Sequence, residues 1–247
     1  PLNSKIPCSL LQNGKNSEVI WRYMNGDDLA RRHDQSPSRW VINFGDMTED
    51  QAQKYREPYQ LIYKRVKPQR DKVKRLAYKE RWWQFAEKCS ALYKSIVGFD
   101  KVLICGNVTK HLSFAFVESK NTIFTANVFV FNLQTWEEFA CLQSTLHEVF
   151  ARTFSPTLET RLSYSPRDAF VPFPFPQSTL SLRNAGEKYH EFRSSIMKSR
   201  AEGLTSTYNY FHDVSNSEPD IVELRKLHVL MDQTAAAAYG WDDIELG

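Results

Sequence analysis

Three residues near the middle of the chain have the types and spacing of a metal-dependent nuclease site. Asp100 is followed by Glu118 and Lys120, which matches a D…ExK pattern on two predicted strands. Carboxylate oxygens at this spacing could bind a divalent cation that assists phosphodiester cleavage. The pattern is short and 25% of the residues are charged, so a chance match is the better interpretation. We therefore expect neither a metal site nor a catalytic residue, and we keep a metal-dependent nuclease as the weaker alternative.

A second set of polar residues could form hydrogen bonds with a ligand. They lie near the ends of predicted strands and outside the apolar pattern, and they are Asn107, Thr109, Lys110, His111 and Arg161. Arg161 alternates with Leu162, so it should face solvent or a ligand from a half-buried strand. It could instead pair with Glu159 or Asp168 and stabilise the edge of the sheet. A lone histidine is usually structural, and the adjacent Lys110 is what makes His111 a candidate.

The positive charge of the chain is concentrated in one stretch, residues 54–81, which we call the basic segment. It contains 11 lysines and arginines against 3 acidic residues, a local charge of +8, whereas the whole chain carries +3. Basic residues interleaved with aromatic ones suit contact with a nucleic acid. A solvated helix face is the competing interpretation. The candidates for phosphate contact are Lys64, Arg65, Lys67, Arg70, Lys72, Lys74, Arg75 and Arg81.

The composition limits the class of protein. A chain of 247 residues can bury a core, and its four cysteines include no CxxC pair, which favours reduced thiols over a zinc site. No apolar run approaches the roughly 20 residues that span a bilayer, so we expect a soluble, cytoplasmic protein. The chain opens on Pro1 rather than methionine, and we expect it to be part of a longer polypeptide.

The first hundred residues should form strands and short helices. Alternating apolar residues indicate the strands, and Thr48 begins a capping-box pattern that indicates a helix start. That helix should break before Pro58, because the residue before a proline disfavours helical geometry. The predicted strands are 19–24 and 39–44, and the predicted helices are 49–56, 59–66 and 69–88.

The middle of the chain is a β region followed by a helix. Short runs of β-branched and aromatic residues, separated by polar breaks, predict antiparallel strands. After them, apolar residues at three- and four-residue spacing predict one helix face over 139–150. The run 170–176 (FVPFPFP) should extend over a core, since its prolines cannot donate sheet hydrogen bonds. The predicted strands of this region are 102–105, 114–117, 122–124, 128–131 and 160–164.

The end of the chain changes character. Residues 178–181 resemble a linker, and helices are predicted at 186–197, with Asn184 as N-cap, and at 220–239. From Arg200 onward there are 9 acidic and 3 basic residues, so we do not expect this part to be the main surface for a polyanion. The predicted fold is α+β, with a mixed, largely antiparallel sheet and flanking helices in residues 1–177 and a helical C-terminal segment in residues 178–247.

Three stretches, in order along the chain, carry a resemblance to a known family. The stretch YMNGDDLARRHDQSPSRWVINFGDMTEDQAQKYREPY, with VKPQRDKVKRLAYKERWWQFAE after it, is similar to the segment that opens the target-recognition domain of type IIG and MmeI-like restriction-modification proteins, which are adenine-specific DNA methyltransferases. The stretch LQSTLHEVFARTFSPTLETRLSYSPRDAFVPFPFP resembles the segment that closes that domain. The stretch GLTSTYNYFHD, followed by IVELRKLHVLMDQTAAAAYGWDDIEL, resembles the C-terminal end of the same proteins.

The resemblance implies a bacterial module that reads a short site in double-stranded DNA. A methyltransferase domain upstream in the same polypeptide would then methylate an adenine with S-adenosylmethionine. The five polar candidates would read base edges, and the eight basic candidates would contact phosphates. This chain has no glycine-rich cofactor loop and no (N/D/S)PP(Y/F) motif, so it should hold no cofactor and catalyse nothing alone. The rival interpretation is an interaction scaffold whose basic face binds RNA or an acidic protein.

Overall fold

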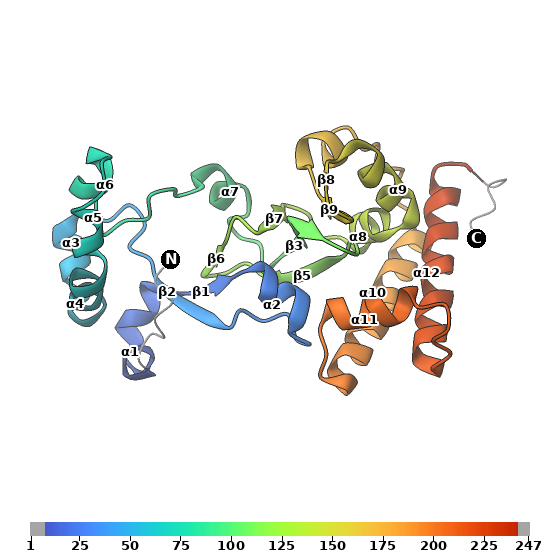
Figure 1. Ribbon diagram of the computed structural model, residues 1–247, viewed down its shortest axis with the longest axis horizontal. Helices are drawn as coiled ribbons and strands as arrows, with labels where there is room; N and C mark the ends of the chain where they lie inside the picture. Colours follow the sequence, from blue (N-terminus) through green and yellow to red (C-terminus); the bar gives the residue numbers. More distant parts are fainter. Residues whose placement is uncertain (1–7, 242–247) are drawn as a thin grey trace. The chain divides into compact units, whose positions relative to one another are not determined.

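The chain contains helices and short strands, with five consecutive strands near its middle and helices at its C-terminal end, and the computed structural model describes residues 8–241 of it (Figure 1). This content confirms the predicted α+β class. Tertiary contacts group the chain into two units. Unit 1 contains the residues up to Met24, Pro37–Val97 and Asn121–Ile123, and unit 2 contains Asn25–Ser36, Gly98–Lys120 and the residues from Phe124 onward.

A three-stranded sheet and several short helices form unit 1. Strand β1 (Ile20–Met24) lies at the centre of the sheet, antiparallel to β2 (Arg39–Ile42) and beside β6 (Thr122–Phe124). Phe44, Tyr59 and Trp82 are among the side chains of its buried core. The helices are α1 (Cys8–Gln12), the 3-10 helix η1 (Gly14–Glu18), α3 (Glu49–Gln53), α4 (Arg56–Arg65), α5 (Lys67–Arg70), α6 (Leu76–Glu80) and α7 (Ser90–Ser95).

Two predicted helices of unit 1 differ from the structure. The long helix predicted at 69–88 is wrong, because the chain forms α5 and α6 there and then turns. Trp82 is buried and donates to Glu49 at 3.2 Å, a tertiary contact that helical periodicity cannot reveal. The predicted break before Pro58 is confirmed, but it falls between Gln53 and Arg56, so α4 begins earlier than expected. Pro58 lies in the first turn of α4, where a missing N–H removes no intrahelical hydrogen bond.

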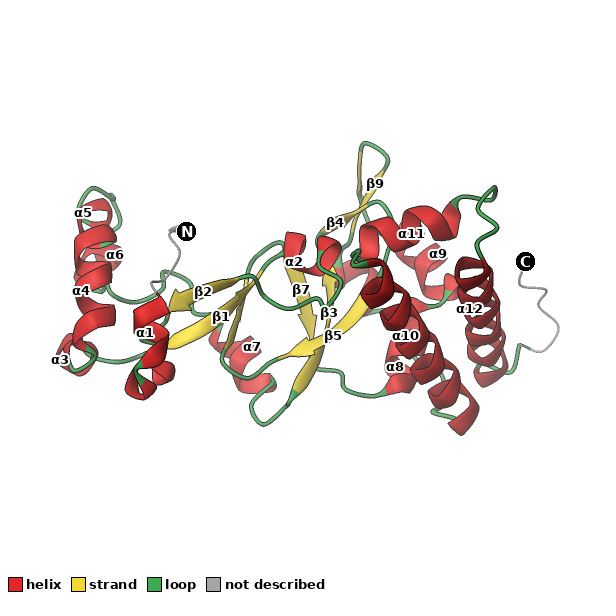
Figure 2. Cartoon of the chain, turned by 90° about the horizontal axis from the view of Figure 1, so that it is seen from below, coloured by secondary structure: helices red, strands yellow, loops and turns green. Residues whose placement is uncertain are grey.

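Two small antiparallel sheets form the β part of unit 2. In the first, the central strand β3 (Lys101–Gly106) pairs with β5 (Phe114–Glu118) and β7 (Val128–Phe131). In the second, β9 (Arg161–Ser163) pairs with β4 (Val108–Thr109) and β8 (Thr157–Leu158), and β4 and β9 lie side by side in Figure 2. The four strand runs predicted between residues 102 and 131 are confirmed as strands.

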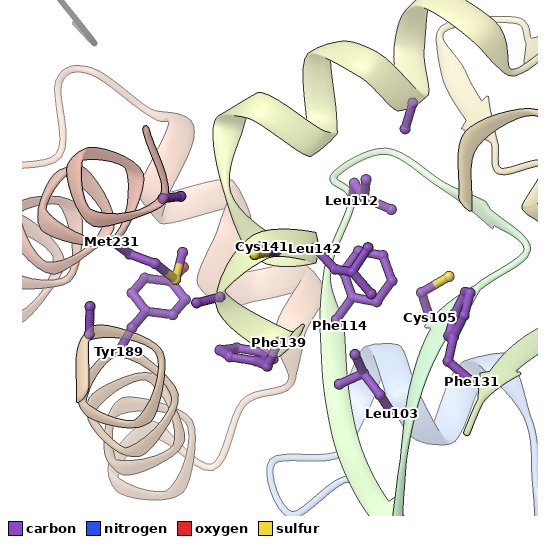
Figure 3. Close-up of a cluster of buried hydrophobic side chains, with 14 of the residues drawn as sticks. Leu103, Cys105, Leu112, Phe114, Phe131, Phe139, Cys141, Leu142, Tyr189 and Met231 are labelled. Atoms are coloured by element: carbon purple, nitrogen blue, oxygen red, sulfur yellow. The ribbon is translucent and has the colours of Figure 1, made fainter. Parts of the chain in front are cut away.

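Helices cover one side of the first sheet and share its core. Leu142 of helix α8 (Trp136–Gln143) lies beside Phe114 of β5, and Phe139 lies on the side of α8 that faces Tyr189 (Figure 3). Because the helices after Thr179 belong to this same core, they are part of unit 2. The predicted division of the chain after residue 177 stays a prediction. The helices are α2 (Gly26–Arg31), α8 (Trp136–Gln143), α9 (Thr145–Phe154), the π-helix η2 (Pro166–Phe170), α10 (Leu180–Arg200), α11 (Leu204–His212) and α12 (Pro219–Ala238).

Helix boundaries in unit 2 depend on capping residues that the apolar pattern does not show. The single helix face predicted over 139–150 is wrong, because Ser144 ends α8 and its Oγ caps α9. Val149 is consequently 59% exposed. Thr179, not Asn184, is the N-cap of α10, so this helix includes part of the predicted linker. No helix among residues 8–241 is long and apolar enough to cross a membrane.

Candidate functional site

A hollow of about 540 Å³ in unit 2 brings the five polar candidates together. We call it the polar hollow. Its wall includes all five residues that the sequence singled out as hydrogen-bonding candidates: Asn107, Thr109, Lys110, His111 and Arg161. The first four follow β3 along the chain, and Arg161 comes from the neighbouring strand β9. The pairing of β4 with β9 is therefore what joins two stretches more than fifty residues apart in one wall.

Backbone hydrogen bonds hold the Asn107 corner of the polar hollow. The Asn107 N–H donates to the Asn127 carbonyl at 2.9 Å, and the Asn107 carbonyl accepts from the Tyr164 N–H at 2.9 Å. Tyr164 is buried, so this corner is attached directly to the core. The side chain of Asn107 has a single long bond, 3.5 Å to the Ala126 carbonyl, and it remains largely available to a ligand.

Lys110 and His111 are held by a residue on α11. The Lys110 Nζ donates to Asn209 Oδ1 at 3.0 Å, and His111 Nε2 lies 3.1 Å from the same oxygen. The His111 ring stacks on the His212 ring with centroids 4.4 Å apart and planes 10° from parallel. Arg152 of α9 donates to the Lys110 carbonyl at 3.0 Å, so both the side chain and the backbone of Lys110 are fixed.

Both histidines of this stack are neutral near pH 7. Burial lowers the pKa of His111 below its usual value, and the cation Lys110 lowers it further. Burial lowers the pKa of His212 to about 4, with a contribution from His111. Neutral imidazoles present one donor and one acceptor each, so this part of the wall offers hydrogen bonds without adding charge.

Arg161 has a partner at the edge of the polar hollow. Its Nη2 donates to Glu159 Oε2 at 2.8 Å, the pairing that the sequence offered as the alternative to ligand contact. Both side chains are substantially exposed, 46% for Arg161 and 75% for Glu159. An exposed pair of this kind is worth about 0–1 kcal/mol, so a ligand with a better acceptor can displace Glu159.

Two helices that the sequence pattern did not assign to the site complete the wall. Helix α2 contributes Asp27 and Arg31, an exposed i,i+4 pair, and α11 contributes Thr205 and Tyr208. The signal for α2 was the Asn25 capping box, which fixes a helix start beside the β3 end. The sequence feature that could have indicated α11 is a polar helical face formed by Thr205, Asn209 and His212. It was not assigned to the site because the C-terminal region is acidic as a whole.

A second, smaller hollow of about 110 Å³ lies in the basic segment of unit 1. We call it the arginine hollow. Two guanidinium groups lie against the Tyr78 ring, that of Arg70 at 5.1 Å and that of Arg75 at 4.6 Å from its centroid, and the Tyr78 hydroxyl accepts from Arg75 at 2.7 Å. Arg81 and Lys88 also line the hollow, Lys88 as the partner of Asp46, and none of the described residues that line it is acidic. A volume of this size surrounded by cations suits a single oxyanion.

The other basic candidates are spread over the surface of unit 1. Lys67 pairs with Asp71 at 3.2 Å and is half-buried. Trp82 and Trp83 both donate their indole N–H groups to unit 1 partners, which fixes them in the core and its rim rather than as free stacking surfaces. The exposed candidates are Lys64, Arg65, Lys72, Lys74, Arg75 and Arg81.

The register of β3 and β5 separates the carboxylates of the nuclease-like pattern. Glu118 is opposite Lys101, and the Ser119 N–H donates to the Asp100 carbonyl at 3.1 Å. The cross-strand partner of Glu118 is therefore Lys101 and not Asp100, which precedes β3. Within the described part of the chain, no three His, Cys, Asp or Glu side chains gather in a way that could hold a metal ion.

Comparisons with known proteins give this arrangement a context. Residues 3–177 match the family model described as the MmeI target recognition domain. No curated protein matches the chain. A solved structure of the type IIL restriction-modification enzyme MmeI in complex with DNA is similar, with a TM-score of 0.67 and 18% identity. The similarity covers 97% of this chain and 30% of that one, so the chain spans under a third of that protein's length and, at this identity, shares its fold.

Proposed function

The chain belongs to the MmeI target recognition domain family, and from this membership we propose that it reads a short sequence in double-stranded DNA for a restriction-modification enzyme. The observation that carries the proposal is the polar hollow. Five side chains chosen from the sequence for their hydrogen-bonding capacity meet there, although they come from two separate stretches of the chain. The MmeI structure contains DNA, which supports the same class of ligand for this chain.

The polar hollow has the chemistry of a surface that distinguishes base pairs. Arg161 and Lys110 can donate to guanine O6 and N7, and Asn107 can bond an adenine edge with its amide. Thr109 is already committed, because its hydroxyl donates to the His111 carbonyl at 2.7 Å. We therefore assign base reading to Asn107, Lys110, His111 and Arg161, and to Thr109 the support of the turn that presents them.

The basic segment supplies affinity that does not depend on sequence. We propose that its cations contact DNA phosphates, and that the arginine hollow holds one phosphate between Arg70, Arg75 and Arg81. Arginine binds phosphate oxygens through two parallel N–H groups, which fixes the position of the backbone as well as attracting it. The remaining exposed cations contribute through their charge.

The chemical step falls to a second domain in this proposal. We propose that this chain acts with a methyltransferase domain upstream in the same polypeptide, which uses S-adenosylmethionine to methylate an adenine in the site, and that the protein works in the cytoplasm. The chain alone, incubated with S-adenosylmethionine and DNA or with magnesium and plasmid, should leave the DNA unmethylated and uncut. Cleavage that disappears in Glu118→Ala would favour the nuclease alternative.

The test of DNA reading is a selection followed by competition. The 247-residue chain is used to enrich duplexes from a randomised library, and the affinity for the enriched duplex is compared with that for each single-base-pair change. We expect each change within the site to weaken binding by about 1–3 kcal/mol. Equal affinity for all duplexes, or tighter binding to structured RNA or an acidic protein, would replace sequence reading by the scaffold interpretation.

A further inference from the structure

Helix α11 lies outside the residues that match the family model, yet it contacts the Lys110–His111 part of the polar hollow. We infer that α11 completes the recognition site and that Asn209 is a positioning residue, which presents Lys110 and His111 in a fixed geometry. The inference rests on the proposed function for its effect on DNA. Its structural part concerns only the contacts among Asn209, Lys110 and His111.

The Lys110 ammonium fixes the orientation of the Asn209 amide. An ammonium group can only donate, so the Asn209 atom 3.0 Å from Lys110 Nζ must be the oxygen. The same oxygen lies 3.1 Å from His111 Nε2, which must then donate to it. Because the pKa of His111 is lowered by burial, the ring is neutral and carries its proton on Nε2. Asn209 thus selects one tautomer and leaves Nδ1 of His111 as an acceptor.

Buried contacts on both sides hold α11 in place for this role. A Cβ at Gly203, which precedes α11, would lie 2.3 Å from the Arg31 carbonyl carbon, so only glycine allows this approach to α2. On the core side, Tyr208 accepts at 2.8 Å from Arg193, a fully buried guanidinium. Arg193 also donates to Gln143 of α8 and to the Phe114 carbonyl of β5. The position of Asn209 is therefore set by the core and not by a mobile surface turn.

The stack of His111 on His212 adds a second contact from the same helix. Asn209 and His212 are three residues apart, which places them on one face of α11, and both meet the Lys110–His111 corner. Without α11, the bond from Arg152 to the backbone of Lys110 would leave the lysine side chain unrestrained. A free lysine side chain attracts phosphates as readily as base edges, so affinity would survive while discrimination fell.

The experiment compares Asn209→Leu, which has the same size and no hydrogen bonds, with Asn209→Asp, which keeps the accepting oxygens. The control is Gln233→Ala on the exposed side of α12. We expect Asn209→Leu to lower the affinity ratio between the enriched duplex and its single-change variants by about fivefold or more, with an unchanged melting temperature. Asn209→Asp should keep the affinity ratio of the unchanged chain, and Gln233→Ala should not change this ratio. In the Lys110→Ala/His111→Ala background, Asn209→Leu should have no further effect.

Two results would overturn the inference. An unchanged ratio in Asn209→Leu means that Asn209 positions nothing, and an equal loss in the Lys110→Ala/His111→Ala background means that Asn209 contacts DNA by itself. A measurement without DNA distinguishes a failure of this inference from a failure of the proposed function. The nitrogen NMR shifts of His111 should show the Nε2–H tautomer in the unchanged chain and a mixture in Asn209→Leu. If His111 is already a mixture of tautomers in the unchanged chain, the inference fails, whatever the DNA-binding measurements show.

Discussion

The guanidinium of Arg161 has two possible partners, and they can be separated by one substitution. Arg161→Ala should change the melting temperature by less than about 4 °C, because the exposed Glu159 pair contributes little to stability. The same variant should bind more equally to duplexes that differ at one base pair, since a base-reading residue contributes about 1–3 kcal/mol of discrimination. Thermal melting and competition binding measure the two effects, with Glu159→Ala as the matched control.

A loss of thermal stability in Arg161→Ala, with base preference intact, would assign this residue to the sheet edge. The reading of DNA would then have to come from the other side chains of the polar hollow. Glu159→Ala tests the role of this ion pair by removing its acidic partner. It should leave stability unchanged and strengthen DNA binding slightly, because a competing carboxylate has been removed.

Residue-level prediction succeeded where the determinant was local. The alternation around Arg161 correctly placed Leu162 and Tyr164 in the core and Arg161 outside, because a strand has a period of two. Asn209 was missed because its partner His111 is 98 residues away in sequence. No local pattern specifies such a pair. Only the fold shows that an exposed asparagine on a helix is the partner of a lysine in a turn.

The close approach of helix α11 to helix α2 depends on Gly203. Gly203→Ala should lower the free energy of unfolding by about 1–3 kcal/mol, because the added Cβ would meet the Arg31 backbone and the helix must shift. Since the shift moves Asn209 away from Lys110, base preference should fall as well. Chemical denaturation measures the first effect and competition binding the second.

Gly14→Ala is the matched control for this substitution, since the space around a Cβ at Gly14 is open. It should change neither the free energy of unfolding nor base preference. A Gly203→Ala variant that keeps full discrimination would show that the position of α11 does not matter for the site.

Tertiary contacts of this kind could not be predicted from the sequence. In unit 1, the structure has the two short helices α5 and α6 where one long helix was expected, because Trp82 turns into the core. The apolar pattern alone does not specify that turn.

For the whole molecule, the uneven charge predicts a measurable salt dependence. Changing Lys72, Lys74 and Arg75 together to alanine should weaken binding to all duplexes alike. The slope of log affinity against log salt should fall by about 0.9 for each phosphate that the variant no longer neutralises. Titrations at several salt concentrations measure the slope. The control changes Lys188, Lys198 and Lys226 of the C-terminal helices, and an unchanged slope in the first variant would remove the basic segment from the DNA surface.

Acid should destabilise the fold through its buried histidines. Burial lowers the pKa of both His147 and His190 to about 3, so both are neutral in the folded state and take up a proton in the unfolded state below about pH 6.5. Stability is therefore complete above pH 6.5 and is lost as the pH falls from 6.5 toward 3. The loss is up to about 1.4 kcal/mol per pH unit for each histidine.

His190 offers a clean test of this acid sensitivity. Its ring lies among Phe116, Trp136 and Phe139, and in the described structure its Nε2 has no hydrogen-bond partner. His190→Phe should keep the packing and remove one titrating group, so the free energy of unfolding should fall less steeply between about pH 6.5 and pH 4.5. Denaturant titrations at several pH values measure the slope, and a slope equal to that of the unchanged chain would contradict the assignment.

The position of α11 beyond residue 177 also limits how a recognition specificity can be transplanted. A chimera that exchanges only the stretch matching the family model would combine the Lys110–His111 turn of one parent with the Asn209 helix of another. Such a chimera would contain Lys110 and His111 of one parent without that parent's Asn209, which orients them. Chimeras joined after α12 should therefore keep the DNA sequence preference of the parent that supplies this segment. Chimeras joined at residue 177 should fold and bind DNA, but they should discriminate less between DNA sequences.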